Sequence, residues 1–301
     1  MHRIIVAMRI GAAALPLGAQ APVLEHFTVA ADGHPLALWA RRPARPKGAI
    51  LLVHGRTWSG LPDFDLQVPG EARSVLASLA AQGYAAYAID LRGYGATPRD
   101  RSGWLTPQRA AADVDIALRW ITAKQPLGVR PVLLDWSVGA MVAQLTAQLH
   151  PEQLSALILY GYPWNPGDVV DPDVDSTSRS PRQRNTRDGA ASDFISPAVT
   201  SPKMVAAYVN AALKADPILA EWRFHDQFNA LSPGRVTMPT LLLQGERDPE
   251  PRAALQRLFT GLGTPDRRWV TLIGGDHAAL LEDTRPAFVD AIVSFLERQK
   301  Q

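Results

Sequence analysis

The hydrophobic positions of this chain fall into short continuous runs that alternate with segments of helical periodicity. Short continuous runs are typical of strands that are buried on both faces of a parallel sheet. They occur at residues 49–53, 85–89, 132–134, 156–160, 240–244 and 269–273. Helical spacing occurs between them, at residues 70–82, 107–121, 138–149, 252–262 and 285–297. The alternation predicts an α/β fold with a doubly wound, mostly parallel sheet.

The first part of the chain has a different pattern. Apolar runs at 27–30 and 35–40 flank the pair Asp32-Gly33. An Asp-Gly pair between two such runs is a strong signal for a β-hairpin, because both residues tolerate the positive φ that a tight turn needs. We therefore expect an antiparallel hairpin before the first parallel strand.

The alternation stops again after the run at 156–160. Residues 164–201 are rich in Pro, Asp, Arg and Ser and have no periodicity. Two pairs, Ser201-Pro202 and Asp216-Pro217, are typical of an N-cap followed by Pro at the start of a helix. They predict helices at about 203–215 and 218–229. We expect one α/β core, formed by residues 22–163 and 235–301, with residues 164–234 as an insertion.

Residues 1–21 have the pattern of a bacterial secretory signal. An apolar region at 4–18 precedes a small-x-small motif at 19–21, although Arg9 interrupts the region and Pro22 follows the motif. The pattern predicts a periplasmic or secreted protein whose mature chain begins at or near Gln20 or Pro22. The alternative is a cytoplasmic protein with a loosely packed N-terminal arm. No later apolar run is long enough to span a membrane.

Composition excludes several classes of function. The 301 residues are 47% hydrophobic and 20% charged, which suits one large globular domain. A net charge of +2 gives no reason to expect a nucleic-acid partner. The chain has no cysteine, so disulfides, thiolate metal sites and a cysteine nucleophile are all excluded.

Ser137 lies between the run at 132–134 and the helical segment at 138–149. A serine at a sharp turn from strand to helix has its hydroxyl clear of the sheet. The N–H of the next residue, Val138, points into the same space from a helix N-terminus and could hold negative charge on a carbonyl oxygen. The alternative is a surface serine that opens an ordinary helix.

Two further residues follow the ends of predicted strands. Asp248 comes after the strand at 240–244, and His277 comes after the strand at 269–273. The carboxyl ends of parallel strands share one edge of a sheet, where ligands bind. A serine hydroxyl needs a base, imidazole titrates near neutrality, and a carboxylate fixes the tautomer of the imidazole. The three residues therefore predict a Ser-Asp-His site at this edge.

From about Phe27 onward the chain resembles the α/β-hydrolase superfamily of serine esterases and lipases. The matching motifs are His54-Gly55, Asp90-Leu91-Arg92-Gly93-Tyr94-Gly95, Trp136-Ser137-Val138-Gly139, Gly245 with Asp248, and Gly275-Asp276-His277. The resemblance implies that Ser137 attacks, His277 transfers the proton and Asp248 orients His277. It also implies that the N–H groups of Arg56 and Val138 form the oxyanion hole and that residues 164–234 form a helical lid. It implies no cofactor and no metal.

Some assignments have alternatives. Glu246 and Asp276 are rivals of Asp248 as the acid. The side chain of Arg56 could bind an acidic substrate or pair with a loop carboxylate, and we favour pairing. His54 is expected to shape the oxyanion loop. Aromatic residues that could line a substrate pocket or belong to the core are Trp58, Trp136, Trp164, Tyr208 and Trp222.

Asp135 departs from the G-x-S-x-G pattern, in which its position is glycine. A carboxylate two residues before Ser137 must find hydrogen-bond donors or take up a proton. It could bind a neighbouring strand end, or it could slow the chemistry by placing negative charge near the oxyanion.

Together these features predict a serine hydrolase that cleaves a small or medium, largely apolar and neutral carboxylic ester through an acyl-enzyme. The alternatives are other acyl transfers on the same triad, by a thioesterase, lactonase, amidase or acyltransferase, and a catalytically silent scaffold that binds a ligand. The oligomeric state cannot be predicted from these features.

Overall fold

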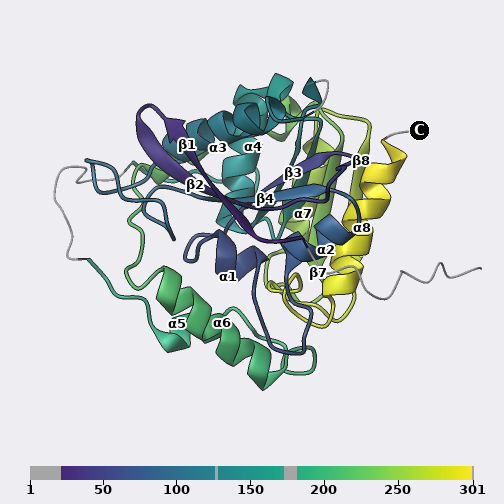
Figure 1. Ribbon diagram of the computed structural model, residues 1–301. Helices are drawn as coiled ribbons and strands as arrows, with labels where there is room; N and C mark the ends of the chain where they lie inside the picture. Colours follow the sequence, from purple (N-terminus) through teal and green to yellow (C-terminus); the bar gives the residue numbers. More distant parts are fainter. Residues whose placement is uncertain (1–21, 126–127, 173–181, 300–301) are drawn as a thin grey trace, which may run out of the picture.

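The computed structural model describes residues 22–125, 128–172 and 182–299. This part of the chain forms an eight-stranded sheet with helices on both faces (Figure 1). The strands are β1 (Glu25–Ala31), β2 (His34–Arg41), β3 (Ala49–Val53), β4 (Ala85–Asp90), β5 (Val132–Trp136), β6 (Ala156–Tyr160), β7 (Thr240–Gly245) and β8 (Arg267–Leu272). The α-helices are α1 (Gly60–Phe64), α2 (Val75–Ala81), α3 (Pro107–Thr122), α4 (Val138–Leu149), α5 (Arg187–Ala191), α6 (Pro202–Ala215), α7 (Arg252–Gly261) and α8 (Arg285–Arg298).

The sheet has the strand order β1-β2-β4-β3-β5-β6-β7-β8. All pairs from β4 to β8 are parallel, whereas β1 pairs antiparallel with β2 and β2 with β4. Asp32 and Gly33 have φ values of 50° and 76°, which is the geometry expected for the predicted hairpin turn. The predicted doubly wound α/β fold is confirmed.

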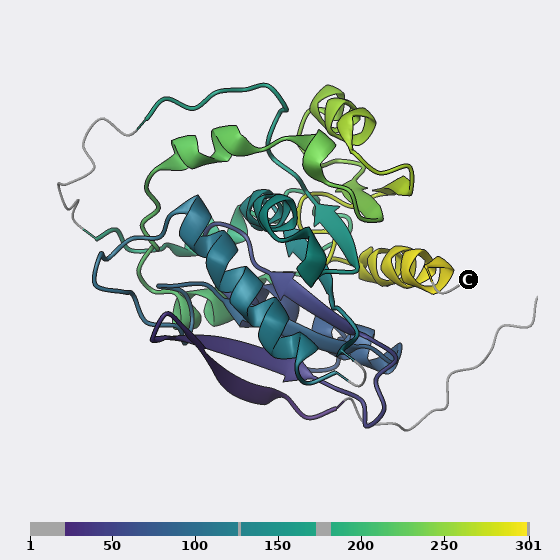
Figure 2. The same cartoon turned by 90° about the horizontal axis from the view of Figure 1, so that it is seen from above.

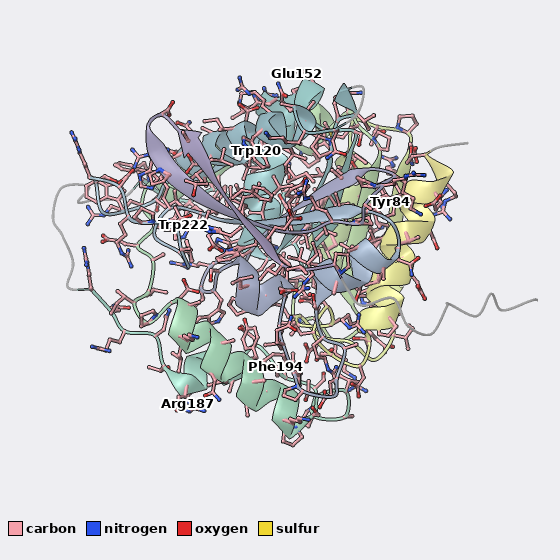
Figure 3. All side chains as sticks on the ribbon, viewed as in Figure 1. Tyr84, Trp120, Glu152, Arg187, Phe194 and Trp222 are labelled. Carbon is pink, nitrogen blue, oxygen red and sulfur yellow. The ribbon has the colours of Figure 1, made fainter. Side chains whose placement is uncertain are left out.

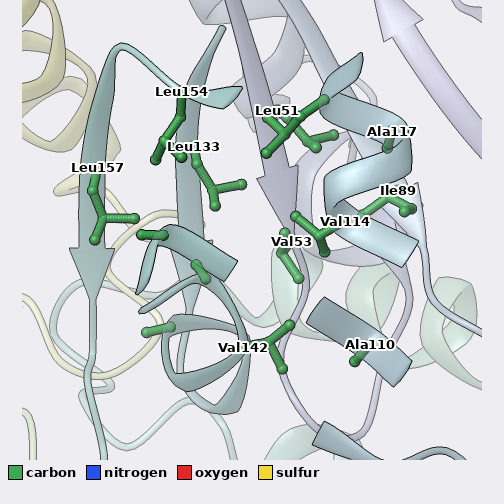
Figure 4. Packing of buried hydrophobic residues seen from close by; sticks show 14 of the residues in the cluster. Leu51, Val53, Ile89, Ala110, Val114, Ala117, Leu133, Val142, Leu154 and Leu157 are labelled. Carbon is green, nitrogen blue, oxygen red and sulfur yellow. The ribbon is translucent and has the colours of Figure 1, made fainter. Parts of the chain in front are cut away.

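Two hydrophobic layers hold the sheet between its helices. On one face, Leu133 and Leu157 pack against Val114 of α3 and Val142 of α4 (Figure 4). Each of these four side chains is fully buried, and such burial contributes about 1.5–3 kcal/mol per side chain. The other face packs against α2 and α8. Figure 2, which views the molecule from above, shows α3 and α4 lying over one face of the sheet.

Residues between β6 and β7 contain α5 and α6 and then the short 3₁₀ helices η3 (His225–Ala230) and η4 (Pro233–Arg235). In Figure 1, α5 and α6 lie beyond α1, on the side of the sheet opposite α3 and α4. The predicted helix at 203–215 is confirmed, because α6 begins at Pro202 with Ser201 as its N-cap.

The predicted helix at 218–229 is wrong. The carboxylate of Asp216 accepts hydrogen bonds from the N–H groups of Ser59 (2.8 Å) and Gly95 (2.8 Å), so it does not cap a following helix. The carbonyl of Glu221 instead accepts a hydrogen bond from the N–H of Leu105. Phe224 has a left-handed φ of 57°. These long-range contacts hold the segment extended until η3 begins.

The predicted helix at 70–82 is shorter than expected. It begins at Val75 because the hydroxyl of Ser74 caps it by accepting a hydrogen bond from the N–H of Ala77. The short helix α1 was not predicted, and its five residues give too short a pattern to detect.

Candidate active site

Ser137 occupies the turn between β5 and α4 in a strained conformation. Its φ of 58° and ψ of −126° are rare for a residue with a side chain, and such strain costs on the order of 1–3 kcal/mol. The N–H of Ser137 donates to the carbonyl of Tyr160 at 2.9 Å, which holds the turn against β6. A Cβ at Gly139 would lie 2.8 Å from the carbonyl oxygen of Val53, so only glycine lets α4 approach β3 this closely.

The loop after β3 presents the second predicted oxyanion donor. His54 is fully buried; its Nδ1 donates to the carbonyl of Gly55 at 2.7 Å, and its Nε2 accepts from the N–H of Leu91 at 3.1 Å. Burial lowers the pKa of His54 to about 4, which keeps this tautomer neutral. Because the carbonyl of Gly55 is held on one side, the N–H of Arg56 in the same peptide must point to the other side.

His277 pairs with Asp248. Nδ1 of His277 donates to Oδ2 of Asp248 at 3.2 Å, and the Asp248 side chain is fully buried. The other oxygen of Asp248 accepts from the N–H of Glu250 at 3.1 Å. Burial acts to lower the pKa of His277, but the hydrogen bond and the charge of Asp248 outweigh it and raise the pKa above its ordinary value. His277 can therefore accept a proton on its second nitrogen.

The two rival acids are engaged elsewhere. Asp276 accepts from the N–H of Ile195 (3.0 Å) and from that of Ala278 (2.8 Å). Glu246 accepts from the N–H of Gly274 at 2.8 Å. Neither carboxylate hydrogen-bonds His277.

The backbone of His277 is held by two aromatic side chains. The indole N–H of Trp136 donates to the carbonyl of His277 at 2.8 Å. The hydroxyl of Tyr160 lies 2.8 Å from the same oxygen and accepts from the N–H of Ala279 at 2.8 Å. Residues from β5 and β6 therefore fix the loop that carries the imidazole. The position of Tyr160 at the end of a buried strand was visible in the sequence, but its partner was not.

Ser137 and His277 line one cavity of about 70 Å³. Its walls come from the loop after β3, from α1, from the end of β5, from the segment after α5 and from the loop after β8. The lining residues are Gly55, Arg56, Thr57, Trp58, Asp63, Trp136, Ser137, Asp193 and His277. Neither Asp63 nor Asp193 lies in a motif, so neither could be recognised as a site residue from the sequence. The cavity thus unites the predicted nucleophile and base with two unexpected carboxyl groups.

The aromatic candidates separate into two groups. Trp58 and Trp136 line the cavity, and Tyr208 contacts its wall through hydrogen bonds to Asp63 and Asp193. Trp164 and Trp222 do not line it. Trp222 is 7% exposed and donates to the hydroxyl of Tyr94 at 2.6 Å in the hydrophobic core. Figure 3 shows Trp222 well apart from Phe194, whose ring packs on Tyr208.

The expected pairing of the Arg56 side chain is not found. Arg56 is exposed, and its guanidinium makes no hydrogen bond or ion pair with any residue in the described parts of the chain. Only its backbone carbonyl is engaged, by the hydroxyl of Tyr94.

Asp135 is fully buried on the face of the sheet opposite Trp136, because successive residues of a strand alternate between faces. Neither carboxyl oxygen has a hydrogen-bond partner among the described residues. Burial raises the pKa of Asp135 well above its ordinary value, and the nearby backbone of Tyr160 offsets this only in part. The protonated, neutral form is therefore favoured, and it places no negative charge beside Ser137.

Comparison with known proteins identifies the family of this chain. The family model described as "Serine aminopeptidase, S33" matches residues 44–284. The chain belongs to this family of α/β-hydrolases. The stretch that the family model matches contains Ser137, Asp248 and His277. A curated relative, protein ABHD14A of Danio rerio, is 33% identical over 120 residues. That stretch covers 40% of this chain and only 39% of the relative.

Solved structures share the fold at low sequence identity. A thermophilic esterase from Thermogutta terrifontis has a TM-score of 0.64 at 18% identity, with 92% of this chain and 100% of that chain covered. A hydrolase from Pseudomonas aeruginosa has a TM-score of 0.64 at 21% identity, with 92% and 99% covered. The thioesterase domain from the curacin biosynthetic pathway has a TM-score of 0.63 at 18% identity, with 90% and 99% covered. These likenesses show that the chain has the α/β-hydrolase fold.

The predicted signal sequence at residues 1–21 lies outside the described residues and remains a prediction. Within the part of the chain that the structure describes, no helix combines the length and the apolar character needed to cross a membrane.

Proposed function

We propose that this protein hydrolyses a carboxylic ester of small or medium size through a serine acyl-enzyme. The observation that carries the proposal is the shared cavity of Ser137 and His277, with Asp248 bonded to the far side of the imidazole. A buried carboxylate at Nδ1 leaves Nε2 as the nitrogen that can take a proton from a serine hydroxyl.

In the proposed reaction, Oγ of Ser137 attacks the ester carbonyl while His277 takes its proton. The N–H groups of Arg56 and Val138 hold the negative charge that develops on the carbonyl oxygen. His277 then gives the proton to the departing alkoxide, and the acyl group stays on Ser137. A water molecule, deprotonated by His277, releases the acid and restores the serine.

Residues 164–234 are proposed to act as a lid over this site. Asp193 of this segment lines the cavity, and Ile195 is bonded to Asp276, the neighbour of His277. Closure of such a segment would exclude water from the acyl-enzyme, and it would make substrate choice depend on the residues it carries.

The test is hydrolysis of a panel of p-nitrophenyl esters with acyl chains of increasing length, with the purified wild type and Ser137→Ala. We expect turnover by the wild type and its loss in the variant, with both proteins folded by circular dichroism. Undiminished hydrolysis by folded Ser137→Ala would contradict the proposal. Thioesters and amides in the same panel separate the alternative acyl transfers.

A further inference from the structure

A second cavity lies on the other side of α1 from the catalytic cavity. Its volume is about 500 Å³, which is in the range of about 300–1,000 Å³ typical of small-molecule sites. It is bounded by the segment before β1, by β2, by α1 and by α6, and it shares no lining residue with the catalytic cavity. Leu61 and Pro62 of α1 line it, whereas Asp63 of the same helix lines the catalytic cavity. The helix α1, which lies between the sheet and α6 in Figure 1, therefore separates the two cavities.

The wall of this second cavity is mostly apolar. Leu24, Trp39 and Leu61 are each half-buried, so part of their apolar surface is left uncovered at the cavity. Ala211 and Ala215 form the wall on the side of α6, and their small side chains leave the space open. Covering such surface with the apolar part of a ligand is favourable, because it removes apolar area from water.

The two carboxylates in this wall already have their donors. Oδ1 of Asp90 accepts a hydrogen bond from the N–H of Gly60 at 2.9 Å, and Oδ2 accepts one from the indole N–H of Trp39 at 2.9 Å. Asp65 accepts two hydrogen bonds from the guanidinium of Arg41, at 2.7 Å and 2.9 Å. Every oxygen of these carboxylates is bonded, so neither selects a cationic ligand. The buried charge of Asp90 also keeps an anionic group away from the inner end of the cavity.

Lys214 brings a positive charge to the mouth of the cavity. It belongs to the last turn of α6, its side chain is exposed, and it lines the cavity. Its ammonium group makes no hydrogen bond or ion pair with any residue in the parts of the chain that the structure describes. A lysine in the last turn of a helix is stabilised by the helix dipole, and this interaction leaves the ammonium group free to pair with an anion.

We propose that this second cavity binds a small amphiphilic carboxylate, with its apolar chain between α1 and α6 and its carboxylate on Lys214. The apolar wall selects the chain, and the unpaired ammonium group at the mouth selects the negative charge. The site goes beyond the proposed hydrolysis and does not depend on it, because none of the residues that line it belongs to the catalytic cavity.

Three probes with the same apolar chain isolate the role of the charge. Octanoate, 1-octanol and octylammonium are titrated into the purified protein by isothermal titration calorimetry, at neutral pH and low salt. We expect the wild type to bind octanoate about three- to fivefold more tightly than 1-octanol, which is the gain from an exposed ion pair. Octylammonium should bind more weakly than either, because Lys214 repels it.

Two lysine variants test the assignment of the anion to Lys214. Lys214→Met should bind octanoate and 1-octanol with equal affinity, because the methionine keeps an apolar chain and removes the charge. Lys203→Met removes another exposed lysine of α6, outside the cavity, and should keep the wild-type preference for octanoate. No binding of octanoate by the wild type, tighter binding of octylammonium, or a preference that Lys214→Met leaves unchanged would overturn the proposal.

Filling the cavity tests where the chain of the ligand lies. Ala211→Phe places a ring in the cavity and should abolish octanoate binding, whereas Ala206→Phe adds the same ring at an exposed position of α6 outside the cavity and should not. Ala215→Phe blocks the same space from the end of α6 and covers the case in which thermal melting shows that Ala211→Phe does not fold. Octanoate binding that the folded Ala211→Phe or Ala215→Phe variant retains would overturn the proposal. None of these measurements reads ester hydrolysis, so their failure would leave the proposed function standing.

Discussion

Gly161 lies so close to His277 that a Cβ at this position would be 2.9 Å from Cε1 and 3.0 Å from Nδ1 of the imidazole. Gly161 directly follows β6 and has a φ of 57°, and its N–H donates to the carbonyl of Leu243 at 3.2 Å. The missing side chain therefore provides the space in which the imidazole lies beside Asp248.

Gly161→Ala is expected to lower kcat/KM by about a hundredfold, because a methyl group would displace the imidazole of His277. A displacement of about 1 Å at a catalytic group can reduce the rate by this factor. Gly167→Ala is the matched control. Gly167 also has a positive φ, of 98°, but a Cβ there would meet no atom within 4 Å. The two variants share the backbone strain, and only the first should lose activity in a steady-state assay. Equal activity in both would show that Gly161 does not limit the position of His277.

Asp248→Asn is expected to lower kcat by about 10⁴-fold, because an amide no longer holds the imidazole in the productive tautomer. Asp276→Asn and Glu246→Gln change the rival carboxylates and are expected to cost far less activity. Steady-state kinetics on one activated ester compares the three variants, and thermal melting checks that each is folded. If Asp276→Asn or Glu246→Gln is crippling while Asp248→Asn is nearly neutral, the acid has been misassigned.

Asp135→Asn is expected to stabilise the protein more at about pH 8 than at about pH 5. Burial raises the pKa of Asp135 in the folded protein. The protonated carboxyl therefore stabilises the fold fully below the unfolded-state pKa of about 3.9. This stabilisation is lost as the pH rises from there toward the folded-state pKa. In that window the free energy of unfolding falls by about 1.4 kcal/mol per pH unit relative to the asparagine variant.

Urea unfolding at several pH values measures this difference. The exposed Asp188→Asn variant controls for the general effect of removing a carboxylate. A difference between Asp135→Asn and wild type that does not change with pH would mean that Asp135 is ionised in the folded protein.

Trp58→Ala and Trp222→Ala are expected to affect different properties. Both side chains are buried, at 3% and 7% exposure, so both variants should lose about 3–5 kcal/mol of stability. Only Trp58 lines the cavity, so only Trp58→Ala should change the ranking of esters by kcat/KM. A changed ranking in Trp222→Ala with an unchanged one in Trp58→Ala would mean that the substrate occupies another part of the molecule.

The strands β3 to β7 could be predicted because they are buried on both faces and their apolar runs need no distant partner to be recognised. Ser137, Asp248 and His277 could be named because each lies within a few residues of the end of a predicted strand. Trp222 could not be assigned, since a buried tryptophan in the core and one in a pocket have the same local sequence. The structure decides this through the bond between Trp222 and Tyr94.

Asp63, Asp193 and Gly161 were missed for a different reason. Each acts through a neighbour distant in the sequence: Asp63 through Tyr208, Asp193 through Trp58, and Gly161 through His277. The helix predicted after Asp216 was wrong for the same reason, because the carboxylate of Asp216 accepts hydrogen bonds from Ser59 and Gly95, which are distant in the sequence. Local patterns do not contain such contacts.

The most direct test of the account is covalent labelling of the wild type and of Ser137→Ala with a fluorophosphonate, followed by intact-mass measurement and peptide mapping. A strained serine that shares a cavity with His277, assisted by the proposed oxyanion N–H groups, should react once, at Ser137, with loss of ester hydrolysis in proportion to labelling. Folded Ser137→Ala should remain unlabelled. A label on another residue, or a fully active enzyme that carries no label, would contradict the assignment of Ser137 as the nucleophile.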